Sequence, residues 1–235
     1  MGADFGGNTL FVDIILHLGT LFAVVAVLRK EIAELFRKPF SRLFMLVAAT
    51  VPAGLTGLLF RDGIDSLMRG NGGVVLLALF FAVTAVLLIT AQSVSERRKH
   101  CVPLGWKHAF LMGAAQACAL FPGISRSGST IVAGVLSGAE KRDVARFSFL
   151  MSIPIILASA LLSVIDVVQT PETVTTIGGA GFVGIAVGFV CSAVSGFFAV
   201  KWMLRIVQNA DYKWFSLYLL LLSAICITLS CAGIL

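Results

Sequence analysis

The sequence is poor in charged residues. Only 13% of its 235 residues are Asp, Glu, Lys or Arg, whereas 58% are hydrophobic. A soluble domain carries about 25% charged residues, so the composition excludes an ordinary soluble enzyme. The net charge of +6 is spread over several short segments, and we therefore expect no nucleic acid among the partners. The composition is typical of a chain that lies in a lipid bilayer.

The sequence also lacks the patterns of a metal centre, a disulfide framework, a signal peptide and a β-barrel. Its five cysteines are odd in number and scattered, and no CxxC pair occurs, so we interpret them as packing residues. The opening residues, MGADFGGNTL, have no basic segment of the kind that begins a signal peptide. The short alternating segments that a membrane barrel needs are missing as well.

Long apolar runs are what the chain does contain. There are six of them, at about 11–28, 43–60, 73–92, 147–167, 180–200 and 215–234. Each is close to the roughly 20 residues that an α-helix needs to cross the hydrocarbon core of a bilayer. The sequence therefore predicts an all-α integral membrane protein with six spans, in a single membrane domain over residues 1–235.

Lysine and arginine are distributed unevenly between the segments that connect these runs. Fifteen of the eighteen lie in 29–42, 95–107, 140–146 and 201–213, whereas only two lie in 61–70. Because cytoplasmic loops carry an excess of Lys and Arg, the four rich segments are predicted to lie inside the cell. Segments 95–107 and 140–146 are both basic, so the chain between them must cross the membrane an even number of times.

The region between those two basic segments is too short for two full spans. Its first arm, 106–121, is apolar but short, and its second arm, 128–138, would be about 16 Å long as a helix. The hydrocarbon core is about 30 Å thick. We therefore predict a re-entrant helical hairpin that turns at Pro122 and Gly123.

The order of three spans, a hairpin and three spans indicates inverted repeats, because each half crosses the membrane an odd number of times. In proteins with inverted repeats, discontinuous helices meet near the midplane and bind substrate there. Residues 106–235 are then the second repeat, a hairpin plus three spans. If the repeated unit is a hairpin plus three spans, residues 1–92 are expected to be the three spans of the first repeat, and this sequence begins after the hairpin of that repeat.

The predicted turn of the hairpin reads LFPGISRSGSTI, residues 120–131. Gly123 and Gly128 permit unusual turns, and a helix that resumes near Ser129 would direct its free N–H groups at the turn. Arg126 adds a planar guanidinium that suits phosphate oxygens. Hydroxyl groups are supplied by Ser125, Ser127, Ser129 and Thr130. The pattern predicts a phosphate or diphosphate site. In the alternative, Arg126 pairs with a carboxylate and the serines cap a kinked helix.

Three further polar residues lie within apolar stretches. Asp13 and His17 are four residues apart and share one face of the first span. They form either a buried pair that orients helices or a catalytic or proton-relay pair. Gln116 lies on the first arm of the hairpin, where it binds either the backbone of the motif or a ligand. The sequence leaves both questions open.

Residues 113–154 resemble a known family. They read GAAQACALFPGISRSGSTIVAGVLSGAEKRDVARFSFLMSIP and are similar to the second signature region of the bacterial undecaprenyl-diphosphate phosphatases, also called bacitracin-resistance proteins. The family pattern is roughly G-x-x-Q-x-x-A-x-x-P-G-x-S-R-S-G-x-T, followed by R-x-x-A-x-F-S-F-L-x-x-I-P. The chain matches it from Gln116 to Pro154, and DIILHLGTLFAVV, residues 13–25, resembles the first full span of the family.

The resemblance implies an integral membrane hydrolase. Members of this family convert undecaprenyl diphosphate to undecaprenyl phosphate and inorganic phosphate, which recycles the lipid carrier of cell-wall synthesis and confers bacitracin resistance. The implied location is the bacterial cytoplasmic membrane, with the site open to the outer side. The implied cofactor is a divalent cation, Mg²⁺ or Ca²⁺. The implied partners are the lipid diphosphate, the membrane, and bacitracin, which competes for the substrate; a homodimer is left open.

The same resemblance implies roles for individual residues. The catalytic group that holds the diphosphate is predicted to be Arg126, Ser125, Ser127 and Thr130. Further contacts to the substrate are predicted for Gly123, Gly128, Ser129, Gln116 and His17. The resemblance assigns no metal ligand to any residue of this sequence.

One feature of the family is not found in this sequence. The other hairpin of the family precedes the first span and carries E-x-x-x-E and a Ser/Thr-rich segment that ends in Gly-His, which supply catalytic or metal-binding groups. Here the first acidic residues are Asp4 and Asp13. We expect either an N-terminally truncated form of a longer protein or a natural variant. As a variant, it would bind or transport polyprenyl phosphate without cleaving it.

Overall fold

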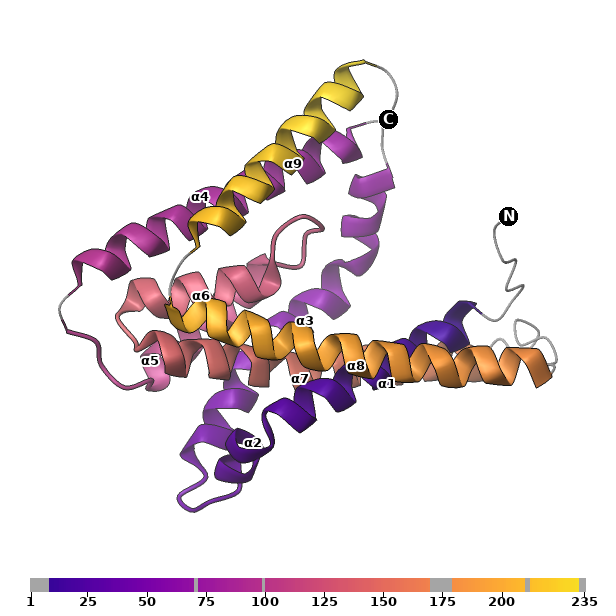
Figure 1. Cartoon of the computed structure of the whole chain (residues 1–235), viewed down its shortest axis with the longest axis horizontal. Coiled ribbons are helices and arrows are strands. Elements are labelled where there is room, and N and C mark those ends of the chain that lie inside the picture. Colours follow the sequence, from indigo (N-terminus) through magenta and orange to yellow (C-terminus); the bar gives the residue numbers. More distant parts are fainter. Residues whose placement is uncertain (1–8, 70–71, 99, 170–178, 210–211, 233–235) are drawn as a thin grey trace. The chain divides into compact units, whose positions relative to one another are not determined.

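The computed structural model describes residues 9–69, 72–98, 100–169, 179–209 and 212–232 (Figure 1). Within these ranges the helices are α1 (Thr9–Val27), α2 (Arg29–Leu35), α3 (Ser41–Arg69), α4 (Gly73–Arg97), α5 (Trp106–Cys118), α6 (Arg126–Ser137), α7 (Lys141–Gln169), α8 (Gly179–Asn209) and α9 (Lys213–Cys231). The predicted all-α architecture is confirmed. Apolar runs fold in this way because a helix satisfies its backbone groups internally, without water.

Among the residues that the structure describes, five helices contain a segment that is long and apolar enough to cross a membrane. These segments are Ser41–Phe60, Gly73–Arg97, Lys141–Ile165, Val183–Val207 and Lys213–Cys231. They correspond to five of the six predicted spans. The remaining prediction, 11–28, coincides with α1, whose apolar part among the described residues is the shorter segment Ile14–Val27. The crossing of the membrane by α1 stays a prediction.

The helices form two compact units. The first consists of Met1–Glu34 and Ser152–Met203, and the second consists of Leu35–Met151 and Leu204–Leu235. Helices α7 and α8 each contribute residues to both units. The single membrane domain and the inverted repeats over 1–92 and 106–235 stay predictions.

In the first unit, α1 packs closely against α8. A Cβ atom added to Gly19 would lie 2.8 Å from the carbonyl oxygen of Phe189, so glycine allows the two backbones to approach. The hydroxyl oxygens of Thr20 and Ser192 lie 3.0 Å apart, and Ser192 Oγ also donates to the carbonyl of Leu16 at 2.7 Å. Small residues and hydroxyl bonds of this kind hold membrane helices together.

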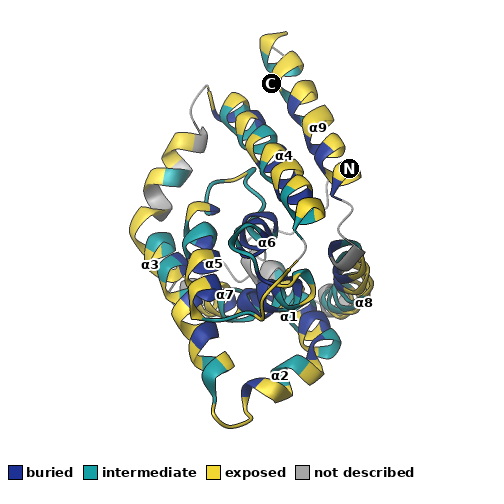
Figure 2. Cartoon of the chain, turned by 90° about the vertical axis from the view of Figure 1, so that its left-hand side faces the viewer, coloured by how far each residue is buried: buried dark blue, intermediate teal, exposed yellow. Residues whose placement is uncertain are grey.

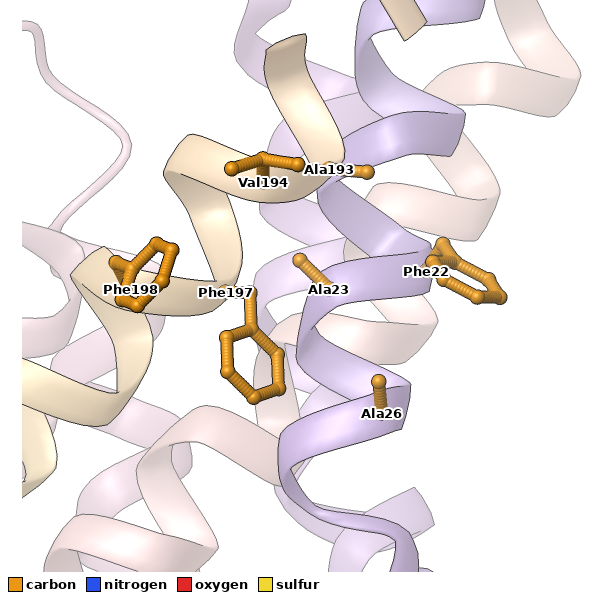
Figure 3. A pocket seen from close by; sticks show the side chains of 7 residues that line it. All are labelled: Phe22, Ala23, Ala26, Ala193, Val194, Phe197 and Phe198. Carbon is orange, nitrogen blue, oxygen red and sulfur yellow. The ribbon is translucent and has the colours of Figure 1, made fainter. Parts of the chain in front are cut away.

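A pocket of about 210 Å³ lies between the same two helices (Figure 3). It is lined by Phe22, Ala23 and Ala26 of α1 and by Ala193, Val194, Phe197 and Phe198 of α8. All of these side chains are apolar, so the lining offers no side-chain group that could hold a phosphate.

In the second unit, α4 contacts α3, α6 and α9, while α5 contacts α3 and α6. Two glycines allow close approach. A Cβ on Gly113 of α5 would lie 2.5 Å from the carbonyl oxygen of Ala49 in α3, and a Cβ on Gly134 of α6 would lie 2.6 Å from Val144 Cγ1 in α7. Most of α6 is accordingly buried or half-buried (Figure 2).

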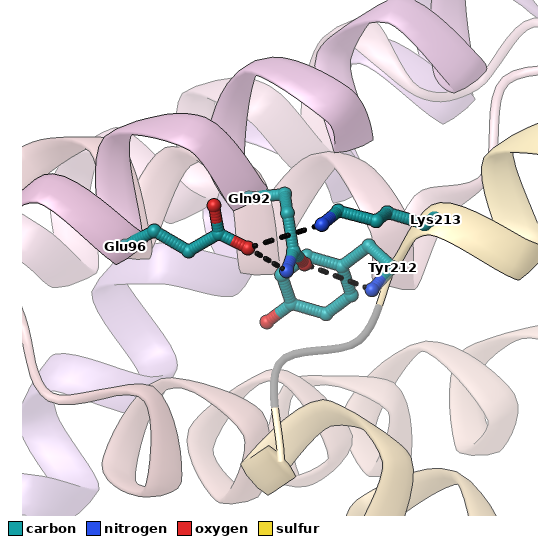
Figure 4. A network of polar contacts seen from close by, with 4 residues as sticks. All are labelled: Gln92, Glu96, Tyr212 and Lys213. Atoms are coloured by element: carbon teal, nitrogen blue, oxygen red, sulfur yellow. Dashed lines mark hydrogen bonds and ion pairs between the residues drawn. The ribbon is translucent and has the colours of Figure 1, made fainter.

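Polar contacts also join α4 to the start of α9 (Figure 4). Gln92 Nε2 donates to Glu96 Oε1 at 2.7 Å, and Gln92 Oε1 accepts the N–H of Tyr212 at 2.9 Å. Lys213 Nζ lies 3.6 Å from the same oxygen of Glu96. The amide of Gln92 is thereby satisfied at both of its ends, which fixes the position of α9 along α4.

Large apolar side chains remain exposed on the described helices, where Figure 2 shows exposed residues in yellow. Leu59, Phe198 and Trp214 are examples, and each is more than half exposed. A soluble protein rarely leaves so much apolar surface uncovered, whereas a bilayer covers it. The five cysteines are all free, and four of them are exposed.

Candidate functional site

Helices α5 and α6 form a helical hairpin in the second unit. They contain 13 and 12 residues, which corresponds to about 20 Å and 18 Å of helix, each shorter than the roughly 30 Å of hydrocarbon. The two arms contact each other, and residues 119–125 connect them. The predicted hairpin is confirmed as a fold, whereas its re-entrant position in the membrane stays a prediction.

The turn between the two arms is built around Gly123, as predicted. Its φ angle is 95°, which lies in the left-handed region that favours glycine. A Cβ atom at Gly123 would lie 2.8 Å from the carbonyl oxygen of Leu77 and 3.0 Å from Phe80 Cβ. The rings of Phe80 and Phe121 pack with their centroids 5.3 Å apart. The turn therefore lies directly on α4.

Helix α6 begins at Arg126, three residues before the predicted start near Ser129, so that prediction is wrong. The physical reason is Ser125, which is the N-cap of the helix: its Oγ accepts the N–H of Gly128 at 3.1 Å. A serine at this position satisfies one of the backbone donors that every helix leaves free at its start. Arg126 consequently occupies the first helical position rather than the turn.

The guanidinium of Arg126 forms no hydrogen bond or ion pair with any residue that the structure describes. Its side chain is half-buried. The alternative in which Arg126 pairs with a carboxylate therefore finds no support among those residues. A cation without a protein partner, at a costly position in an apolar chain, is better explained by an anionic ligand.

The first turn of α6 also offers backbone donors. Within the described ranges, the N–H groups of Arg126 and Ser127 have no acceptor, because the first N–H groups of a helix have no partner inside it. The positive end of the helix dipole lies at the same place. The guanidinium, the two N–H groups and the half-buried hydroxyl of Ser127 thus belong to adjacent residues and can together bind an anion.

Thr130 and Ser129 are buried on α6. Thr130 is 1% exposed, and its Oγ1 lies 2.6 Å from Ser148 Oγ of α7. It also donates toward the carbonyl oxygens of Arg126 and Ser127, at 3.1 Å and 3.0 Å. The hydroxyl of Thr130 therefore has protein partners, and its contact with a diphosphate stays a prediction.

Gln116 of α5 is 2% exposed, and no hydrogen-bond partner of its Nε2 is found among the described residues. An unsatisfied buried amide costs about 1–3 kcal/mol, so a water molecule or a ligand group that accepts from it would stabilise the fold. Of the two possibilities that the sequence left open, this favours a ligand over the motif backbone for that donor.

His17 belongs to α1 in the first unit, and its side chain is exposed. The residues of the motif belong to the second unit. The side chain of Asp13 lies outside the described residues. The predicted Asp13–His17 pair and the contact of His17 with the substrate therefore stay predictions.

The part of the chain that the structure describes contains no group of three or more His, Cys, Asp and Glu residues that could hold a metal ion. The motif itself offers a cation, N–H donors and serine hydroxyls, whereas Mg²⁺ and Ca²⁺ prefer carboxylates and other oxygens. The described residues thus do not fit a resident metal centre, and the divalent cation implied by the resemblance stays a prediction.

Two residues that support the hairpin were not predicted. Thr84 of α4 accepts the N–H of Ser125 at 3.2 Å. Arg98 donates from Nη1 and Nη2 to the carbonyl oxygens of Val135 and Leu136, at 3.0 Å and 3.1 Å, and so caps the end of α6. No motif marks either residue, because each acts on a segment about 40 positions away in the chain.

The chain is similar to known proteins over nearly its whole length. A family model described as bacitracin resistance protein BacA matches residues 2–225. A protein of Carboxydothermus hydrogenoformans named undecaprenyl-diphosphatase is 36% identical over 227 residues, covering 96% of this chain and 85% of the relative. A protein of Parabacteroides distasonis with the same name is 37% identical over 223 residues, covering 91% of this chain and 80% of the relative. One of Bacillus cereus named undecaprenyl-diphosphatase 4 is 35% identical over 222 residues, covering 94% and 82%.

Proposed function

The chain belongs to the bacitracin resistance protein BacA family, and from this membership we propose that it hydrolyses undecaprenyl diphosphate to undecaprenyl phosphate and inorganic phosphate. The relatives carry the name of this activity. In the chain itself, the observation that supports the proposal is Arg126. It is a cation without a partner among the described residues, and it stands at the start of a helix inside the family motif.

Arg126 and the first turn of α6 would hold the diphosphate through its oxygens. The guanidinium can bind two phosphate oxygens at once. The N–H groups of Arg126 and Ser127 lie at the positive end of the helix dipole, where they can donate to the negatively charged diphosphate. Ser125 contributes differently, since its Oγ is already bonded to the N–H of Gly128. Ser125 thereby stabilises the conformation of the first turn of α6.

In the reaction, the oxygen of a water molecule attacks the terminal phosphorus, and the bond from this phosphorus to the bridging oxygen breaks. The bridging oxygen leaves with the lipid phosphate, and the proton that the attacking water gives up passes to the surrounding water. Negative charge spreads over the transferring phosphoryl group and the leaving oxygen. Arg126 and the open N–H groups would stabilise that charge, and a single preorganised donor of this kind is worth about 10²–10³ in rate.

The experiment that tests this function measures phosphate release from undecaprenyl diphosphate by the full chain in detergent. Arg126→Ala should lower kcat/KM at least about a hundredfold. Arg126→Lys keeps the charge but loses the planar fork, so it should recover only part of the activity. The matched control is Arg205→Ala, which removes the same charge at an exposed position of α8. A wild-type chain without phosphate release, or equal rates for the two alanine variants, would contradict the proposal.

We propose that the divalent cation, Mg²⁺ or Ca²⁺, enters together with the diphosphate, because phosphate oxygens are ligands that Mg²⁺ commonly uses. The donor set of the described residues supports this route over a resident metal centre. Removal of divalent cations with a chelator should stop phosphate release, and added Mg²⁺ or Ca²⁺ should restore it. Unchanged activity in the chelator would rule out a role for the cation.

We propose that the membrane is the bacterial cytoplasmic membrane, with the basic segments inside and the site open to the outer side. A membrane-impermeant thiol reagent on intact cells tests the orientation of the spans. In a background without the other cysteines, the exposed Cys101 should stay unlabelled, whereas Ser66→Cys, at an exposed position in 61–70, should react. The opposite pattern would invert the topology.

We propose that bacitracin competes for the same lipid diphosphate. Cells that overproduce the chain should then tolerate more bacitracin, and cells that overproduce Arg126→Ala should not. Equal bacitracin tolerance in both strains would show that resistance does not depend on the site at Arg126. Assembly of two copies as a homodimer stays a prediction, which light scattering of the detergent-solubilised chain can measure.

A further inference from the structure

Thr84 is a buried hydroxyl residue in the apolar helix α4, with 1% of its surface exposed. A threonine within a helix can satisfy its hydroxyl by donating to the carbonyl four residues earlier, and Thr84 Oγ1 has this contact with Phe80 at 3.0 Å. Thr90 in the same helix has the equivalent contact with Val86 at 2.8 Å but is exposed. The two threonines therefore differ in what else they touch.

The additional contacts of Thr84 reach the turn of the hairpin. Its Oγ1 accepts the N–H of Ser125 at 3.2 Å and lies 3.4 Å from the carbonyl oxygen of Gly123. A hydroxyl has one hydrogen, for which the carbonyls of Phe80 and Gly123 compete, but its lone pairs remain available to a donor. The contribution of Thr84 to the turn is thus mainly that of an acceptor for the N–H of Ser125.

Ser125 connects this contact to the site. Its Oγ accepts the N–H of Gly128 at 3.1 Å, and its carbonyl oxygen accepts the N–H of Ser129 at 2.8 Å. The next residue is Arg126, the first of α6. The bond from the N–H of Ser125 to Thr84 therefore acts on the residue directly before the first turn of α6.

Apolar packing and this hydrogen bond have different effects on the turn. Gly123 and Phe121 pack on Leu77 and Phe80 of α4, which places the turn on that helix but is not directional. A hydrogen bond weakens steeply when its angle departs from linearity. Thr84 thus adds a directional contact at the N–H of Ser125, beside the hydrogen bond within the turn from the N–H of Ile124 to the carbonyl oxygen of Phe121 at 3.1 Å.

We propose that Thr84 is a positioning residue for the diphosphate site: its hydroxyl holds the N–H of Ser125 and so sets the direction in which α6 presents Arg126 and the open N–H groups of Arg126 and Ser127. The inference rests on the proposed function. A displacement of about 1 Å at a distance from the chemistry can lower a rate about a hundredfold. Thr84→Val should accordingly lower kcat about ten- to a hundredfold, with a smaller change in KM.

The test compares Thr84→Val, Thr84→Ser and Thr90→Val as full chains in detergent, with undecaprenyl diphosphate as substrate. Valine keeps the shape of threonine without the hydroxyl, serine restores the hydroxyl, and Thr90→Val removes a hydroxyl that bonds within its own helix. Values of kcat, KM and Tm are measured for each. We expect Thr84→Ser and Thr90→Val to keep most of the activity. Equal kcat values for the two valine variants, or an equal loss in Thr84→Ser and Thr84→Val, would overturn the proposal.

A second pair keeps the test decisive if Thr84→Val does not fold. Thr84→Ala and Thr84→Ser both lack the methyl group and differ only in the hydroxyl. A lower kcat in the alanine variant supports the positioning role, and equal kcat values overturn it.

Failure of the proposed function can be distinguished from failure of this inference. If the wild-type chain releases no phosphate, the Kd for undecaprenyl diphosphate is measured for wild type, Thr84→Val and Thr84→Ser. A higher Kd in Thr84→Val that returns to the wild-type value in Thr84→Ser supports the positioning role. Equal Kd values in the three proteins overturn it. A wild-type chain that neither cleaves nor binds this lipid overturns both proposals.

Discussion

The hydroxyl oxygens of Thr130 in α6 and Ser148 in α7 lie 2.6 Å apart, and both side chains are buried. Thr130 Oγ1 also contacts the carbonyl oxygens of Arg126 and Ser127. The pair therefore connects α7 to the first turn of α6, the same turn that carries Arg126. Thr84 supports this turn from α4 through Ser125, so two helices hold it by side-chain hydroxyls.

A double-mutant cycle measures the contact between Thr130 and Ser148. Thr130→Val should lower the free energy of unfolding by about 1 kcal/mol, because it leaves the buried hydroxyl of Ser148 without its partner. Ser148→Ala should cost less, because Thr130 Oγ1 keeps the carbonyl oxygens of Arg126 and Ser127 as acceptors. The double variant should lose less than the sum, with a coupling of about 0.5–1.5 kcal/mol. Additive losses would show that the bond contributes nothing. If Thr130 instead contacts the diphosphate directly, Thr130→Val should lower kcat/KM far more than Ser148→Ala does.

Gln116→Met tests the buried amide that has no partner for its Nε2 among the described residues. Methionine keeps the length of the side chain, and removal of the unsatisfied donor should leave Tm unchanged or raise it. If the amide serves the lipid diphosphate, the Kd should weaken about tenfold.

Gln92→Met is the matched control, because the amide of Gln92 bonds to Glu96 and to the N–H of Tyr212. This substitution should lower Tm and leave the Kd unchanged. A fall in Tm for Gln116→Met of the same size would indicate that its amide is structural.

Gly113→Ala tests the close contact between α5 and α3, where a Cβ would lie 2.5 Å from the carbonyl oxygen of Ala49. Backbone atoms cannot move away as a flexible side chain can, so we expect a loss of about 1–3 kcal/mol in the free energy of unfolding. Gly54→Ala in α3 is the control, because a Cβ there meets no atom within 4 Å. It should be neutral or stabilising by roughly 0.5–1 kcal/mol. Equal effects of the two substitutions would contradict the close packing.

Alkaline pH should destabilise the second unit through Tyr212. Burial raises the pKa of Tyr212 to about 12, from an ordinary value of 10.0. Below about pH 10 the phenol is neutral in both the folded and the unfolded chain, so the full contribution of Tyr212 to the free energy of unfolding is present. Between about pH 10 and 12 the unfolded chain releases the proton while the folded chain retains it, so the free energy of unfolding falls as the pH rises.

Tyr212→Phe removes that titration and should flatten the fall. Unfolding of wild type and variant, followed across this pH range in detergent, measures the difference. Identical pH dependence in the two proteins would assign the alkaline loss to other groups.

Several features of the fold could be predicted because they depend on local composition. The apolar runs predicted the helices, since lipid leaves a backbone few other ways to satisfy its donors and acceptors. Short arms between two basic segments predicted the hairpin, and the Pro122–Gly123 pair predicted its turn. The predicted start of α6 was three residues too late. The sequence allowed Ser125 either to cap the helix or to bind a phosphate, and only the first role places the helix start at Arg126.

The sequence by itself determined the all-α membrane architecture, the hairpin, and the contiguous motif that contains Arg126 and resembles a family. These follow from hydrophobicity, charge and a contiguous motif, all of which act over short stretches of chain. The tertiary structure alone decided which groups surround that motif: Thr84 beneath Ser125, Ser148 beside Thr130, and Gly113 against Ala49. Each of these contacts joins residues of different segments of the chain. The sequence of an apolar span does not indicate which residue of another helix will contact one of its hydroxyls, because the hydrophobic periodicity is the same in every case.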